Sequence, residues 1–166
     1  MTAAVLPPAQ WELLRPADRS VGPDAGRLKG VFVAKEASES IAFTQVFRDL
    51  ESACKAAGRK NWDGYGAEPV DFAAVQRALA FIEVLPATAP PPEVSVDPDG
   101  EVAFTWEASR RMIFSVSVGR TDAIGYAGVF GSDSTYGREY FADELPSAVA
   151  SNLARLYPKG SRQRFV

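Results

Sequence analysis

The sequence contains no histidine and only one cysteine, Cys54. Without imidazole the chain cannot build a Ser-His-Asp or Cys-His pair from its own residues, and it lacks the commonest general base. One cysteine excludes an internal disulfide, and without histidine the ligands of a conventional zinc site are missing. These absences do not exclude an enzyme that relies on carboxylates, Lys, Tyr or Arg. These absences nevertheless favour a non-catalytic protein and predict no metal and no cofactor.

Long apolar runs and an excess of positive charge are also missing. No segment reaches the roughly 18 apolar residues of a membrane span, and the N-terminus lacks the basic stretch and apolar core of a secretory signal. The chain has 18 Lys and Arg against 21 Asp and Glu, a net charge of −3. This balance argues against a dedicated nucleic-acid binder. We expect a cytoplasmic protein whose partner is another protein or a second copy of itself.

What is present is typical of one globular domain. The chain has 166 residues, of which 46% are apolar and 23% charged, enough to bury a substantial core. Residues 1–29 contain prolines and scattered charges without a sustained period, which predicts an extended, partly disordered arm. A short strand is expected at 30–35. We predict a single α+β domain over 30–157 and a basic tail over 158–166.

Three segments have the three- and four-residue apolar spacing of amphipathic helices. The first runs from about Ser40 to Gly58 and contains Cys54 in its apolar stripe, which predicts a buried, unreactive thiol. The second runs from about Phe72 to Leu85, with Asp71 as its N-cap. The third spans about 143–157 and is expected to be capped by Asp143.

Between the second and third helices the apolar period changes to two. Residues 93–129 predict an antiparallel meander of three or four strands, separated by turns such as DPDG at 97–100. Its apolar face is expected to hold Phe104, Trp106, Phe114 and Val116. The opposite face carries small residues, for which plain solvent exposure is favoured over a docking surface. Residues 136–142 could add an edge strand. The predicted fold is α+β, with the helices packed on one face of this sheet.

Residues 61–69, NWDGYGAEP, join the first two helices. Gly64 and Gly66 permit positive φ, and Asp63 can accept backbone N–H groups in an Asx turn. All nine residues can be explained as a joint between helices, and we favour this interpretation. The alternative is a ligand loop in which Trp62 and Tyr65 supply aromatic walls and Asp63 a carboxylate. The loop matches neither of the glycine-rich phosphate motifs.

Residues 131–137, GSDSTYG, are predicted to form a polar surface loop. As a binding loop it would offer Asp133, Ser134 and Tyr136. The acidic pairs Asp97/Asp99 and Asp143/Glu144 have local explanations, the first in a turn and the second at a helix N-terminus, where negative charge is favourable.

The order W-D-G-x-G-A, then a helix, a proline-rich connector and DPDGEVAFTWE resembles a group of small uncharacterised bacterial proteins. The resemblance covers roughly residues 61–130, and its matching positions are Trp62, Asp63, Gly64, Gly66, Ala67, Pro69, Asp99, Gly100 and Trp106. It implies no activity and no catalytic residue. The group's association with mobile and accessory DNA favours a role in binding a partner.

We therefore predict a protein-binding accessory, inhibitor or antitoxin-like protein that is not catalytic. Its expected binding residues are Trp62, Asp63 and Tyr65 of the first loop, and Asp133, Ser134 and Tyr136 of the second. The alternatives are a small-molecule or cofactor-binding protein that uses Trp62–Gly66 as a pocket wall, and an enzyme that works without histidine.

Overall fold

The computed structural model describes residues 41–86 and 88–158 of the chain. The predicted arm at 1–29, the predicted strand at 30–35 and all of the tail after Pro158 lie outside these residues. The described elements are α2 (Ile41–Ala56), α3 (Phe72–Val84), β1 (Glu93–Val96), β2 (Val102–Ser109), β3 (Met112–Val118), β4 (Ala123–Phe130), β5 (Asp133–Tyr140) and α4 (Ser147–Leu156). No helix among the described residues is long and apolar enough to cross a membrane.

The strands form one antiparallel sheet in the order β1-β2-β3-β4-β5. The α+β class and the meander are therefore confirmed. The predicted number of three or four strands is wrong, because the sheet has five. The fifth strand consists of residues 133–140, whereas the sequence indicates an edge strand only over 136–142. Ser, Thr, Tyr and Gly suit a half-exposed edge strand as well as they suit a loop, so composition alone does not separate the two.

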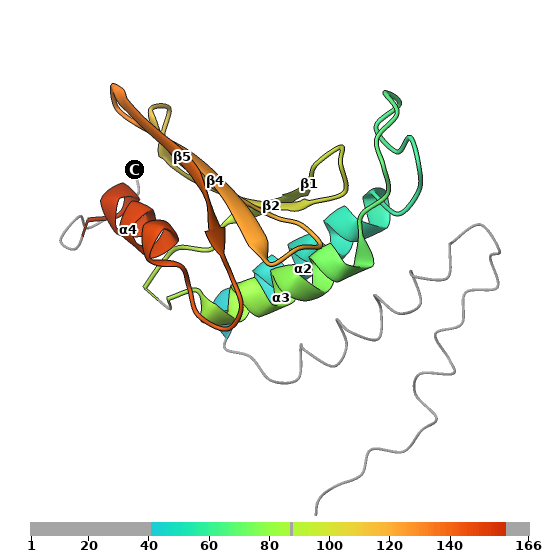
Figure 1. Ribbon diagram of the computed structural model, residues 1–166, viewed down its shortest axis with the longest axis horizontal. Coiled ribbons are helices and arrows are strands. Elements are labelled where there is room, and N and C mark those ends of the chain that lie inside the picture. The colour runs from blue at the N-terminus through green and yellow to red at the C-terminus, as the bar shows by residue number, and fades with distance from the viewer. Residues whose placement is uncertain (1–40, 87, 159–166) are drawn as a thin grey trace, which may run out of the picture.

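All three described helices pack on one face of the sheet. In Figure 1, α2 and α3 lie beneath the sheet, and α4 lies beside them, where it packs on β3 and β4. The four aromatic and aliphatic side chains predicted to face this layer are buried, with exposed fractions of 0–1% for Phe104, Trp106, Phe114 and Val116. The expected core face is therefore confirmed, and no described helix or strand covers the opposite face.

The helices agree with prediction except at some of their ends. The Asp71 carboxylate accepts the N–H groups of Ala73 and Ala74, so Asp71 caps α3 as expected. Cys54 is buried against the core, and burial raises its thiol pKa to about 12. The predicted start of the last helix at Asp143 is wrong, because α4 begins at Ser147 after Pro146. Proline disfavours the helical conformation in the residue before it, so Leu145 cannot continue a helix through this point.

Candidate functional site

The loop at 61–69 is held in shape by its own side chains. Asp63 Oδ1 accepts the N–H groups of Tyr65 at 2.8 Å and Ala67 at 3.1 Å, and Asn61 Oδ1 accepts that of Gly66 at 2.6 Å. Gly64 and Gly66 have φ values of 81° and 97°, which glycine adopts without the steric cost of a side chain. The N–H groups, that of Tyr65 first, hold the pKa of the Asp63 carboxyl below its usual value. Its carboxylate thus orders the backbone, as the joint interpretation predicts.

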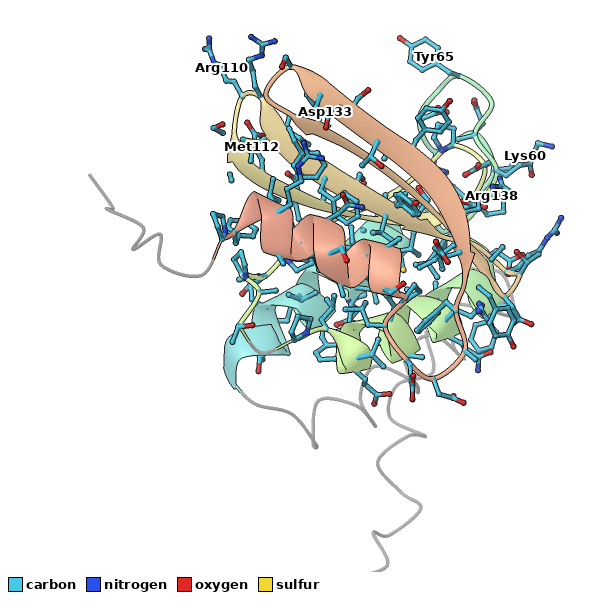
Figure 2. All side chains as sticks on the ribbon, turned by 60° about the vertical axis from the view of Figure 1, so that its left-hand side comes forward. Lys60, Tyr65, Arg110, Met112, Asp133 and Arg138 are labelled. Carbon is cyan, nitrogen blue, oxygen red and sulfur yellow. The ribbon has the colours of Figure 1, made fainter. Side chains whose placement is uncertain are left out.

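The same loop is bonded to the DPDG turn between β1 and β2. The N–H of Glu68 donates to the carbonyl of Pro98 at 2.8 Å, and that of Asp71 to the carbonyl of Gly100 at 3.1 Å. Trp62 Nε1 donates to the carbonyl of Glu68 at 3.0 Å. The two motifs that carry the sequence resemblance therefore form one structural unit. Tyr65 is the exception: it is 95% exposed at the tip of the loop and points away from the domain (Figure 2).

The second group of predicted site residues lies in β5, so the predicted loop at 131–137 is wrong. Asp133 pairs with Phe130 across a tight turn that contains Gly131, whose φ is 73°. This geometry begins the strand at once and leaves only two residues for the turn. Asp133 turns toward the helices and accepts from Arg155 of α4 at 2.6 Å, which lowers the pKa of its carboxyl. Ser134 and Tyr136 alternate with it and belong to the other face.

That other face, which we call the open face, is the side of the sheet away from the helices. Its strand positions are known from the register: Ser115 pairs with Ala127, and Ala127 pairs with Tyr136. Small side chains occupy the middle strands, while the large side chains of Tyr136 and Tyr140 come from β5. Tyr136 is 85% exposed, Tyr140 70% and Val129 of β4 44%. The open face is thus low over β3 and β4 and rises at β5.

A hollow of about 440 Å³ lies on the open face. Ser115, Ser117 and Ala127 form part of its lining, with Tyr136 and Arg138 of β5, and Glu101 at the end of the DPDG turn. Thr105 Oγ1 and Ser115 Oγ lie 2.8 Å apart beside it. Small side chains on adjacent strands leave this space because they do not reach as far from the sheet as their neighbours on β5 do.

The end of the hollow near the DPDG turn is acidic. Burial raises the pKa of the Glu101 carboxyl, with a further increase from nearby Asp99, while Arg138 acts in the opposite direction. Burial also raises the pKa of Asp97, although the Ser117 hydroxyl, which donates to Asp97 Oδ2 at 3.3 Å, partly offsets this. Three carboxylates are opposed here by one guanidinium. A bound cation would therefore be stabilised at this end.

Sequence reasoning placed only part of this site. Of the six predicted binding residues, Tyr136 lines the hollow and Ser134 shares its face, whereas Asp133 points toward α4 and Trp62, Asp63 and Tyr65 belong to the 61–69 loop. None of these last three lines the hollow. Glu101 and Arg138 were missed. Continuing the two-residue alternation from β4 through 134–140 would have placed Tyr136 and Arg138 on the open face.

Within 41–86 and 88–158, no group of three or more His, Cys, Asp or Glu side chains is arranged to hold a metal ion. Comparisons with protein-family models, with curated proteins and with solved structures find no match to this chain.

Proposed function

We propose that the protein acts without catalysis, by binding another protein on the open face of its sheet, in an accessory, inhibitory or antitoxin-like role. One observation carries the proposal: of the large apolar or aromatic side chains exposed on the described domain, Val129, Tyr136 and Tyr140 share this face, and only Tyr65 lies elsewhere. Exposed apolar groups gathered on one surface are characteristic of interaction sites.

The chemistry of β5 suits protein recognition. Tyr136, Arg138 and Tyr140 follow one another on the open face of this strand. Tyrosine and arginine are enriched among the residues that dominate binding energy at protein interfaces. The small residues of β3 and β4 beside them would let a partner's backbone or side chains approach the sheet closely.

The acidic end of the hollow constrains the partner further. A basic side chain that enters the hollow toward Glu101 would meet carboxylates whose negative charge is only partly compensated, as their raised pKa values indicate. We therefore propose a protein partner that places an apolar segment over Tyr136 and Tyr140 and a lysine or arginine in the hollow. Both parts of this contact are on the open face, so one substitution in the hollow can test them together.

The test uses Ala127→Arg, which places a long side chain in the hollow. Its control is Ala150→Arg, the same change at an exposed position of α4. Immobilised wild-type protein and the control should retain the same partner from an extract of the native host, while Ala127→Arg should retain less. Retention of that partner by Ala127→Arg, or recovery of no protein by the wild type, would refute the proposal.

A second candidate function is binding of a small cationic ligand in the hollow. Its volume of about 440 Å³ is within the usual range for ligand pockets, and the partly buried carboxylates favour it. The version in which Trp62–Gly66 forms the pocket wall has less support, because those residues do not line the hollow. Thermal-shift screening of wild type and Ala127→Arg against amines and guanidines would detect such a ligand. Turnover lost on Glu101→Gln would point instead to a histidine-free enzyme.

A further inference from the structure

The outer edge of β5 is a row of backbone hydrogen-bonding groups with no described strand beside it. β5 is eight residues long and ends the strand order, whereas β1 at the other end has four residues and packs against α2. Exposed edge strands of this length are templates for pairing with another chain. The strand contains no proline or lysine, two residues that commonly block such pairing.

The register determines which backbone groups point outward. Asp133 faces Phe130 across the two-residue turn, and beyond the strand the N–H of Phe141 donates to the carbonyl of Asp122 at 2.7 Å. The backbone groups of Asp133 and Phe141 therefore point toward β4 and the turn before it. Because the direction alternates along an antiparallel ladder, Ser134, Tyr136, Arg138 and Tyr140 direct their N–H and C=O groups to the outer edge. Of these groups, the N–H of Ser134 already donates to Asp133 Oδ1 at 3.0 Å. All four residues are exposed.

We propose that β5 pairs antiparallel with β5 of a second copy of this chain, joining two five-stranded sheets edge to edge. The proposed register places Gly137 opposite Gly137 on the two-fold axis. Tyr136 then lies opposite the second copy's Arg138, and Tyr140 opposite its Ser134. The four outward residues of each strand meet the outward residues of the other, so their backbone groups find partners across the axis. The N–H of Ser134 exchanges its bond to Asp133 Oδ1 for one to the second copy.

Side-chain chemistry selects this register over its neighbours. A guanidinium opposite a tyrosine ring is a favourable pair, and it occurs twice because of the symmetry. Sliding the copies by two residues one way brings Arg138 opposite Arg138. Sliding them the other way brings Glu139 opposite Asp133. Like charges directly opposite one another destabilise a sheet, so only the proposed register of these three avoids repulsion. This inference goes beyond the proposed function and does not depend on it.

The first test exchanges charges across the axis. In the full-length chain, Tyr136→Lys would place a lysine opposite the second copy's Arg138 at two symmetric positions. Sedimentation equilibrium should show dimers for the wild type and a dissociation constant raised about ten-fold or more for this variant. Adding Arg138→Glu should restore the dimer, because each introduced lysine would then face an introduced glutamate. A wild type that is monomeric at every concentration, or a double variant no tighter than the single one, would overturn the proposal.

A second test removes one outward hydrogen bond. Arg138→Pro deletes an edge N–H that β4 does not use, so the fold should persist, as circular dichroism would check. Its matched control is Arg138→Thr, which removes the same side chain and keeps the N–H. The proline variant should be monomeric and the threonine variant should still dimerise. Equal dimerisation of the two would overturn the proposal.

Hydrogen exchange separates the dimer from coverage by another part of the same chain. The amides of Tyr136, Arg138 and Tyr140 should be protected in the dimer and exchange faster on dilution. Protection of these amides in a monomer would mean that another segment of the chain covers the edge, which would overturn the proposal. Loss of the dimer is measured by sedimentation of the purified chain alone, whereas loss of the proposed partner is measured by retention from native-host extract, so the two failures are distinguishable.

Discussion

At the scale of single residues, two aspartates show how the surroundings of a carboxyl decide its role. Asp63 accepts two backbone N–H groups, which lower its pKa, and its work is to order a loop. Asp97 is partly buried beside the hollow, and burial raises its pKa. The sequence offers Asp63 as a candidate binding group and Asp97 only as a turn residue. In the structure, the carboxyl whose charged form is disfavoured by its surroundings is that of Asp97.

We predict opposite pH dependences for these two carboxyls. Because the pKa of Asp97 is raised in the folded state, its carboxyl contributes stability to the fold below the unfolded pKa of 3.8. This contribution is lost as the pH rises through the folded pKa. Asp97→Asn should therefore gain stability relative to wild type as the pH rises from about 3 to 7. Because the pKa of Asp63 is lowered in the folded state, its carboxylate contributes stability above pH 3.8. The stability lost in Asp63→Ala should therefore be greatest at neutral pH and shrink in acid. Urea unfolding at several pH values measures both. Parallel profiles for the two variants would show that the two environments do not differ.

At the scale of elements, the 61–69 loop and the DPDG turn depend on each other. Gly100 has a φ of 86°, and a Cβ there would lie 2.7 Å from the carbonyl oxygen of Pro69. Gly64 has a similar φ of 81°, but nothing lies within 4 Å of the corresponding Cβ position. Alanine substitutions at Gly64 and Gly100 therefore distinguish the free-energy cost of the backbone conformation from the cost of crowding the neighbouring loop.

Gly64→Ala should cost about 1 kcal/mol, the strain of a left-handed alanine. Gly100→Ala should cost about 2–4 kcal/mol, because the methyl group also pushes against Pro69. Chemical denaturation of the two variants tests the difference. Equal losses would mean that the loop shifts freely away from the turn, and that the two motifs are not a single packed unit.

At the scale of the whole molecule, the sheet has one face that is buried under the described helices and one that is exposed. Phe104 is fully buried on the helix-covered face, and the centroid of its ring lies 5.2 Å from that of Phe81. Val129 on the open face is 44% exposed. The two faces should therefore respond differently to truncation of a side chain.

Phe104→Ala should destabilise the fold by about 3–5 kcal/mol, because it leaves a cavity in the core. Val129→Ala should change stability by less than about 1 kcal/mol while weakening the proposed partner contact. Thermal unfolding and the binding measurement with native-host extract check the two parts. A large loss of stability for Val129→Ala would indicate that the open face contributes to the core after all.

The amino-acid sequence by itself determined the features that depend on local periodicity. Apolar spacing located α2 and α3, and alternation located β2 and β3 with Phe104 and Trp106 on the buried face, because each pattern repeats within a few residues. It also indicated that Cys54 is a core residue and that Asp71 caps a helix, since stripes and caps are read from neighbouring positions.

Only the tertiary structure decided what distant segments make together. Ser, Thr, Tyr and Gly at 133–137 are compatible with loop or strand, and pairing with β4 selects the strand by satisfying its backbone groups. The hollow brings together Glu101 from a turn, Ala127 from β4 and Arg138 from β5, and no spacing along the chain encodes that proximity.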